Sequence, residues 1–180
     1  MGDPMTDPMT DPMTRRLAGA SDLHIHGAPD VRPRYADHVT LAQEAQAVGM
    51  RAIVLKCHVF STADVAALVD SMVEGLRVFG GVVLNEPLGG INPAAVAATL
   101  AIGGKCVWMP TQDAANHRRV VGGSGGIGVL SSSGQLRGEV REVVELASEH
   151  QAILATGHLA PKESVAIVTT PCRWPVRGWL

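Results

Sequence analysis

Short apolar runs alternate with segments of helical periodicity along most of the chain. The apolar runs, rich in valine, isoleucine, leucine and alanine, predict strands at residues 21–26, 52–56, 78–84, 106–109 and 152–156. The segments between them repeat apolar residues at helical spacing and predict helices at residues 40–48, 62–73, 93–102 and 140–150. Strands joined by helices are typical of a buried parallel sheet, so the pattern predicts an α/β fold.

Residues that start or stop helices support these limits. Gly49 follows the first predicted helix, and Ser61 and Thr62 are candidate caps for the second. Asn92 is a candidate N-cap for the third helix, with Pro93 at its first position.

Four segments fall outside this alternation. Residues 1–18, with three copies of Asp-Pro-Met-Thr, predict a disordered tail because their prolines deny a helix its amide donors. The glycine- and serine-rich segment 122–138 predicts a flexible loop with a small hairpin. Residues 165–170 fit either a sixth strand or a helix, and residues 169–180 form an irregular tail. The folded domain is therefore expected at residues 19–168.

Composition and charge narrow the function classes. A chain of 180 residues with 46% hydrophobic residues is large enough to bury a single core. Its net charge of -2, with acidic and basic residues mixed, predicts neither nucleic-acid nor membrane-surface binding. No stretch approaches the ~20 apolar residues of a membrane span. The balanced charge leaves a small-molecule substrate or a protein partner as the expectation. Three cysteines without a CxxC pair favour a cytoplasmic protein.

The stretch DLHIHGAPD, residues 22–30, carries the first candidate site. Alternation along a strand places Asp22, His24 and His26 on one face and Leu23 and Ile25 on the other. Two imidazoles side by side at a strand end predict half of a metal site, because imidazole is the commonest protein ligand for transition metals. Two hydrogen-bonded histidines at a strand end remain the alternative.

Polar side chains follow every predicted strand. Since reactive groups of parallel α/β folds gather at the carboxyl ends of strands, these positions predict one shared site. The residues concerned are His24 and His26, Lys56 and His58, Asn85 and Glu86, Thr111, Gln112 and Asp113, and Thr156 and His158.

Lys56 closes the apolar run AIVLK, where a charged lysine is costly unless it is paired or its charge is removed. One interpretation is a lysine whose stem packs on the sheet edge while its ammonium reaches water. The other is a lysine that meets a carboxylate, or one carboxylated so that it bridges metals. His58 is either a further metal ligand or a cap of the turn before the next helix.

The remaining candidates lie on loops. Gly89 and Gly90 let the backbone approach a ligand, or simply form a tight turn, and Asn85 before them is a candidate for substrate binding. His117 and Arg118 either contact substrate or belong to a solvated turn.

His158 follows the fifth predicted strand, and Glu163 begins the next helix. A histidine nitrogen and a carboxylate oxygen together suit zinc, manganese or iron.

A strand-borne DLHIHG with further histidines at later strand ends resembles the metal-dependent amidohydrolase superfamily and the related polymerase-histidinol-phosphatase-type (PHP-type) phosphoesterases. The ordered segments DLHIHGAPD, AIVLKCH, VVLNEPLGGINP, VWMPT and ATGHLAPKE look like an uncharacterised amidohydrolase-like group of cytosolic proteins. The resemblance implies a (β/α)8 or distorted barrel, with His24 and His26 as metal ligands and His158 as the histidine after the fifth strand. Lys56 matches the bridging lysine of these families only loosely, because that lysine usually follows the fourth strand.

The chain departs from the resemblance in its length. A complete (β/α)8 barrel needs about 250 residues, and only five strands are predicted here. The histidine after the sixth strand and the catalytic aspartate after the eighth have no counterpart in this sequence. We therefore expect an incomplete barrel, with about five to six of eight βα units, in a C-terminally truncated member of the group.

The expected activity is hydrolysis of an amide or cyclic amide of a small molecule by water activated on a divalent metal, zinc in the first place and manganese or iron otherwise. Its candidate catalytic residues are Lys56 and Glu163, and its candidate metal ligands are His24, His26, His58 and His158. One alternative is phosphoester hydrolysis of the PHP type. The other is a non-catalytic remnant that binds only metal or ligand, with exposed apolar flanks that favour a homo-oligomer or a partner chain.

Overall fold

The structure is a computed structural model that describes residues 16–173 and 178–179. It contains two parallel sheets in which the strands lie side by side in chain order. The first sheet consists of β1 (Ser21–Ile25), β2 (Ala52–Leu55) and β3 (Arg77–Phe79). The second consists of β4 (Gly81–Val83), β5 (Cys106–Trp108), β6 (Ile153–Ala155) and β7 (Gly178–Trp179). The α/β class is thus confirmed, and the described strands do not close into a barrel.

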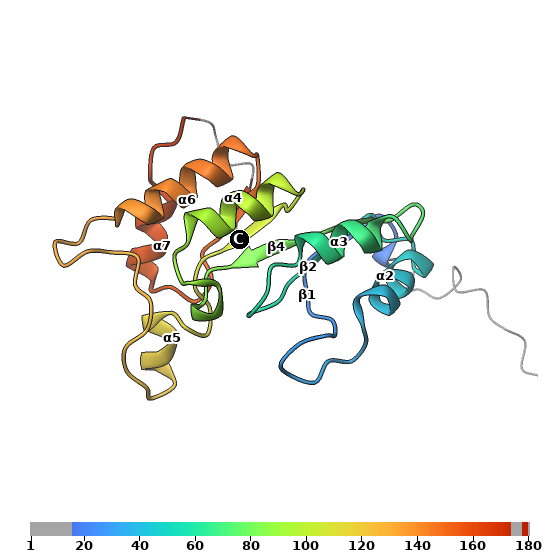
Figure 1. Cartoon of the computed structure of the whole chain (residues 1–180), viewed down its shortest axis with the longest axis horizontal. Coiled ribbons are helices and arrows are strands. Elements are labelled where there is room, and N and C mark those ends of the chain that lie inside the picture. The colour runs from blue at the N-terminus through green and yellow to red at the C-terminus, as the bar shows by residue number, and fades with distance from the viewer. Residues whose placement is uncertain (1–15, 174–177, 180) are drawn as a thin grey trace, which may run out of the picture.

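Helices lie between the strands in sequence and pack in two groups (Figure 1). The helices α2 (His38–Ala47) and α3 (Ala63–Asp70) lie beside the first sheet. The second sheet is accompanied by α4 (Pro93–Ala101), α6 (Gly138–Glu149) and α7 (Pro161–Val168). Two short elements, the 3-10 helix η2 (Glu86–Leu88) and the helix α5 (Ala115–Val120), follow β4 and β5. None of the described helices is both long enough and apolar enough to cross a membrane.

The predicted strand at residues 78–84 is divided in two at Gly80. Its first part, β3, pairs with β2, and its second part, β4, pairs with β5. Thr62 holds the break together: its amide donates to the Gly81 carbonyl (3.0 Å), and its hydroxyl accepts from the Gly81 amide (3.0 Å). A Cβ on Gly80 would lie 2.2 Å from the Thr62 carbonyl oxygen, so this close approach needs a glycine. The prediction of one uninterrupted strand was wrong because it could not include this contact.

The second sheet is buried on both of its faces, and each face packs in a different apolar cluster. Paired residues Val82, Val107 and Leu154 face the main core, where they join Val96 of α4 and Val143 of α6. The next row points the opposite way.

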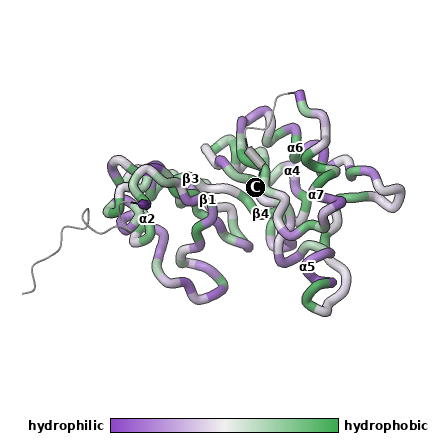
Figure 2. The backbone as a smooth tube through the Cα atoms, turned by 180° about the vertical axis from the view of Figure 1, so that it is seen from behind, coloured by the Kyte–Doolittle hydropathy of each residue, from purple (hydrophilic) through white to green (hydrophobic). Residues whose placement is uncertain are grey.

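That row consists of Val83, Trp108 and Ala155, which pack with Val54 in a separate buried cluster. The face opposite the helices therefore carries its own small apolar cluster. In Figure 2, residues along β4 are coloured as hydrophobic, and many residues of the connection between β1 and α2 are coloured as hydrophilic.

A bulge in β1 changes the predicted alternation. Asp22 pairs with Ile53, but the next pair is Ile25 with Leu55, so β1 has one residue more than β2 in this interval. Ile25 packs on the helix side, whereas Leu23 packs against the opposite cluster. The prediction that Leu23 shares the face of Ile25 was therefore wrong, because a bulge breaks the two-residue period of a strand.

Most predicted helices are present with shifted ends. Asn92 caps α4, with its Oδ1 accepting from the Ala95 amide (3.2 Å). Thr62 does not cap α3 with its side chain, because its hydroxyl donates to the Leu55 carbonyl (2.7 Å). The first helix begins at His38 rather than residue 40, because the Asp37 side chain caps it by accepting from the Thr40 amide (2.8 Å).

The segments outside the regular pattern have mixed outcomes. Residues 165–168, which fit either a strand or a helix, belong to helix α7. The expected hairpin in residues 122–138 is reduced to a single antiparallel bridge between Leu130 and Leu136. The C-terminal tail contributes the short strand β7, which the sequence pattern did not predict. Most of the N-terminal tail, residues 1–15, lies outside the described residues.

Gly81→Ala tests the packing of β4. A Cβ at Gly81 would lie 2.0 Å from the Cys106 carbonyl oxygen and 2.7 Å from the Trp108 ring. We expect this substitution to lower the free energy of unfolding by about 1–3 kcal/mol, measured by urea denaturation. Gly138→Ala is the control, because the Cβ there meets nothing within 4 Å, and it should change stability little. Equal effects of the two substitutions would contradict the packing described here.

Candidate functional site

The carboxyl ends of β1, β2, β5 and β6 meet around one cavity. Its volume is about 290 Å³, and it opens on the sheet face opposite the helices. Its lining combines apolar side chains with polar ones: Leu23, His24, Lys56, Trp108, Thr111, Ala155, Thr156, Gly157 and His158. The prediction that His24, Lys56 and His158 gather at one rim therefore agrees with the geometry.

His24 and His26 lie side by side at the end of β1. Their Nε2 atoms are 3.1 Å apart, and their ring centroids are 5.0 Å apart. Asp22 accepts a hydrogen bond from the His24 amide (2.9 Å) within the bulged part of the strand. Burial lowers the pKa of both histidines, that of His26 to about 4, where the positive charges of Arg34 and Lys56 add to the effect. At neutral pH both rings are therefore neutral, which is the form that binds metals.

Lys56 is almost fully buried, with 2% of its surface exposed. Its Nζ lies 3.2 Å from His24 Nε2 and 5.1 Å from the centre of the Trp108 ring. Burial lowers the pKa of Lys56 to about 8, so the side chain is still mostly charged at neutral pH. The alternative of a lysine that reaches water at the sheet edge is excluded by its burial. Trp108, which the sequence reasoning missed, forms the wall beneath this ammonium.

His58 extends the cluster on the side of β2. Its ring stacks on that of His26 at 4.9 Å between centroids, and its Nδ1 lies 2.9 Å from the Thr111 hydroxyl. Burial lowers the pKa of His58 to about 4. The ring is thus oriented by a neighbour on another strand and does not cap the start of α3.

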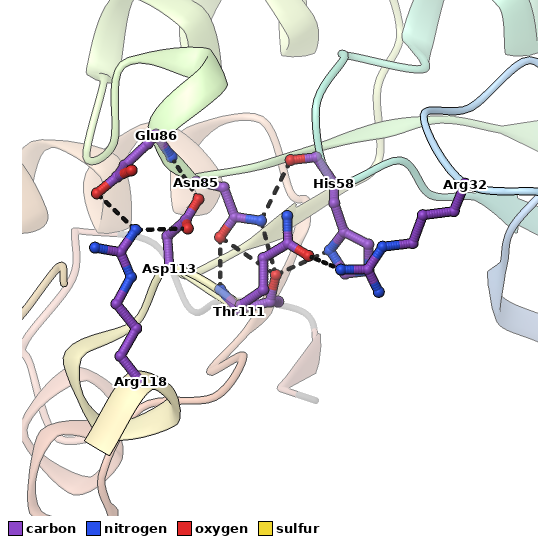
Figure 3. A network of polar contacts seen from close by, with 8 residues as sticks. Arg32, His58, Asn85, Glu86, Thr111, Asp113 and Arg118 are labelled. Atoms are coloured by element: carbon purple, nitrogen blue, oxygen red, sulfur yellow. Dashed lines mark hydrogen bonds and ion pairs between the residues drawn. The ribbon is translucent and has the colours of Figure 1, made fainter. Parts of the chain in front are cut away.

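Asn85 lies beside His58 and is bonded to Thr111 (Figure 3). The Asn85 amide donates to the Thr111 hydroxyl (2.9 Å) and to the His58 carbonyl (3.2 Å), while its oxygen accepts from the Thr111 amide (2.9 Å). Asn85 and Thr111 are fully buried. Asn85, predicted as a substrate contact, is therefore occupied in joining the ends of three strands.

The connection between β1 and α2 contributes an ion pair beside the histidines. A terminal guanidinium nitrogen of Arg34 lies 2.5 Å from an Asp30 carboxylate oxygen, and the same nitrogen approaches His26 Nδ1 at 3.4 Å. The Asp30 side chain is 1% exposed, and its Oδ1 is buried without a hydrogen-bond partner among the described residues. Asp30 ends the stretch DLHIHGAPD, yet nothing in the pattern indicated that the chain folds back there.

His158 meets His117 across the rim. Their Nδ1 atoms are 3.0 Å apart, and the His158 carbonyl accepts from the Asn116 side chain (3.0 Å). Burial lowers the pKa of His158, and the neighbouring His117 and the charge of Lys56 act in the same direction. His117 thus lies close to a predicted ligand, with α5 carrying it there.

Two further candidates are engaged elsewhere. Arg118 forms ion pairs with Glu86 (2.8 Å) and Asp113 (2.9 Å), on the side of Asn85 away from His58 in Figure 3. Glu163 accepts from the Val129 amide (3.1 Å) and the Ala160 amide (2.9 Å). The two hydrogen bonds of Glu163 join the loop before α6 to the start of α7. Glu163 therefore has a structural role away from the histidine pair.

The histidine pair fits two ligands of one metal ion. Nitrogens bound to zinc at 2.0–2.1 Å in a tetrahedron lie about 3.3 Å apart, close to the 3.1 Å between His24 and His26. Within the part of the chain that the structure describes, no group of three or more histidine, cysteine, aspartate or glutamate side chains is placed to hold a metal ion. His58 and His158 lie near the pair, and each has one nitrogen engaged by another side chain, as His24 has with Lys56.

Comparison with known protein families assigns the chain to a family but indicates no activity. The model of a family of unknown function, DUF6282, matches residues 19–177. Neither the curated proteins nor the solved structures yielded a match.

Thr111→Val tests the network beneath His58. The substitution removes one of the two acceptors of the buried Asn85 amide, and we expect the free energy of unfolding to fall by about 1–3 kcal/mol in urea denaturation. Thr169→Val removes the same hydroxyl from an exposed helix end and should cost much less. Similar losses in both variants would show that the network contributes nothing particular.

Asp30→Asn tests the buried ion pair. Burial alone would raise the pKa of Asp30, but the hydrogen bond and charge of Arg34 outweigh it and lower the pKa below its ordinary 3.8. Since the folded pKa is below the unfolded one, the stabilisation is present above about pH 4 and is lost as the pH falls through the folded pKa. We expect Asp30→Asn to cost about 1–3 kcal/mol at neutral pH and progressively less in acid, in denaturation curves across this range. The exposed control Asp64→Asn should show no comparable pH dependence, and a cost for Asp30→Asn that stays constant into acid would contradict the assignment.

Proposed function

Because the chain belongs to the DUF6282 family, whose function is unknown, we propose its function from the geometry of the rim: a metal-dependent hydrolase of the amidohydrolase type. Its substrate is an amide or cyclic amide of a small molecule, in keeping with a cavity of about 290 Å³. The observation that carries the proposal is the pair of neutral imidazole nitrogens 3.1 Å apart on β1. The sequence resemblance of DLHIHG to amidohydrolases points the same way.

His24 and His26 are the proposed primary ligands, and His58 and His158 are the nearest candidates to complete the set. Zinc is the preferred ion, with manganese or iron as alternatives, because imidazole suits all three. A divalent ion bound there supplies hydroxide at neutral pH by lowering the pKa of its water.

The chain's own residues prepare the site for this chemistry. Burial keeps His24 and His26 neutral, and the Thr111 hydroxyl orients His58. Leu23 and Trp108 form apolar walls of the cavity. Lys56 is the remaining candidate for a catalytic role, whereas we assign Glu163 to structural support.

We also propose that the two sheets form part of a barrel. Parallel strands in chain order, with helices on one face and the candidate site at the carboxyl ends, match the arrangement of (β/α)8 enzymes. The division at Gly80 is then a bend within one barrel strand, because β3 and β4 are joined through a single residue.

Two other functions have specific support. Lys56, Arg32 and Arg34 surround the histidines with positive charge, which favours a phosphoester as the substrate. The described strands do not close into a barrel, which favours a remnant that binds metal or ligand without turnover. A chain of this kind would expose the edge of the first sheet at β1. We therefore expect it to associate with a second copy or with a partner chain.

Metal binding is tested with histidine variants. We expect His24→Ala and His26→Ala each to weaken Zn²⁺ binding at least about 100-fold in isothermal titration, because each removes one of the paired nitrogens. His150→Ala removes an exposed histidine at the end of α6 and should leave binding unchanged. Equal binding by all three variants would contradict the site.

Turnover separates the hydrolase from its alternatives. The Zn²⁺-loaded and Mn²⁺-loaded protein is assayed against panels of N-acyl amino acids, cyclic imides and phosphomonoesters, with and without chelator. Chelator-sensitive amide cleavage that His26→Ala abolishes supports the proposal, and cleavage of phosphomonoesters alone assigns the PHP type. Metal binding without any turnover supports the binding-only function.

A further inference from the structure

The cavity at the rim contains a buried charge without an opposite charge. Lys56 is 2% exposed and lines the cavity with His24 and Trp108. Among the residues that the structure describes, no carboxylate forms an ion pair with Lys56. Burying an ammonium without an opposite charge is costly, so this side chain is a candidate for binding an anion.

The neighbours of Lys56 do not offset this charge. The His24 nitrogen at 3.2 Å is neutral, and the Trp108 ring at 5.1 Å offers only the weak attraction between a cation and an aromatic face. Asp30, the buried carboxylate on the same rim, is already paired with Arg34. The cavity is therefore electropositive and open to a ligand.

The walls on either side of Lys56 indicate what else the ligand contains. Leu23, Trp108 and Ala155 form an apolar surface, and Thr156 and His158 provide polar groups at the opposite side. A cavity of about 290 Å³ accommodates a molecule the size of a single ring with a few substituents.

We propose that this cavity binds a small organic anion, whose carboxylate or phosphoryl group pairs with Lys56 and whose apolar part lies against Trp108 and Leu23. The proposal rests on the proposed function in one respect only: it names the substrate class for the same site. Lys56 is then a substrate-positioning residue that holds the acid group while the reacting bond lies toward the histidines.

The test compares ligands that differ only in charge. Benzoate and benzamide have nearly the same shape, so their difference in affinity reports the ion pair. In the presence of chelator, we expect the wild-type protein to bind benzoate about tenfold or more tightly than benzamide in ligand-detected NMR titrations. Phenyl phosphate, titrated in parallel, identifies a phosphoryl group as the preferred anion if it binds more tightly than benzoate.

Lys56→Met removes the charge and keeps most of the length of the unbranched side chain. We expect the preference for benzoate over benzamide to fall to about onefold in this variant. Lys105→Met removes an exposed lysine at the opposite, amino end of β5 and should keep the wild-type preference. Thermal denaturation of Lys56→Met should show equal or greater stability, because the variant loses an unpaired buried charge.

Equal affinity of the wild-type protein for benzoate and benzamide would overturn the proposal, and so would a preference that survives Lys56→Met. Because the titrations contain chelator, they do not depend on the metal site. Unchanged Zn²⁺ binding in the histidine variants together with a benzoate preference in the wild type would contradict the metal site alone. Weakened Zn²⁺ binding in those variants without a benzoate preference in the wild type would contradict the anion site alone.

Discussion

The contact between Thr62 and the Gly80–Gly81 step is the constraint on which the arrangement of the two sheets depends. The Thr62 hydroxyl reaches the carbonyl at the end of β2 (2.7 Å) and the amide that begins β4 (3.0 Å). On the far side of the step, the Lys105 amide donates to the Gly80 carbonyl (2.8 Å). One buried threonine and two residues without side chains thus allow a strand to leave one sheet and enter the next.

The consequence for the site is that the carboxyl ends of β1, β2, β5 and β6 reach one rim. His24 and His26 come from β1, Lys56 and His58 follow β2, and His158 follows β6. The Asn85 and Thr111 pair lies between the two sheets and binds the His58 backbone as well as its ring. Because a polar pair buried at this point is fully hydrogen-bonded, it fixes the rim without leaving unpaired groups.

The electrostatics of the rim are unusual for a buried region. The positive charges of Lys56, Arg32 and Arg34 lower the pKa values of nearby histidines. Asp30 forms an ion pair with only one of these cations, Arg34. Burial, with the nearby cations adding to it, lowers the pKa values of the imidazoles and keeps them neutral, which suits metal binding. The same cations attract an anion. The two proposals for this site therefore rest on different consequences of one charge distribution.

The local signals in the sequence determined a good deal of this protein. Apolar runs and helical periodicity located the elements from residue 21 to residue 156, and Asn92 and Gly49 marked helix ends, because these preferences depend on neighbours along the chain. The grouping of His24, Lys56 and His158 also followed from sequence, since parallel strands bring their carboxyl ends together. Only the tertiary structure decided the break at Gly80, the bulge that turns Leu23 to the cavity side, and the engagement of Glu163 with Val129. Each of these depends on atoms that are distant in sequence, or on a strand register that no local pattern encodes.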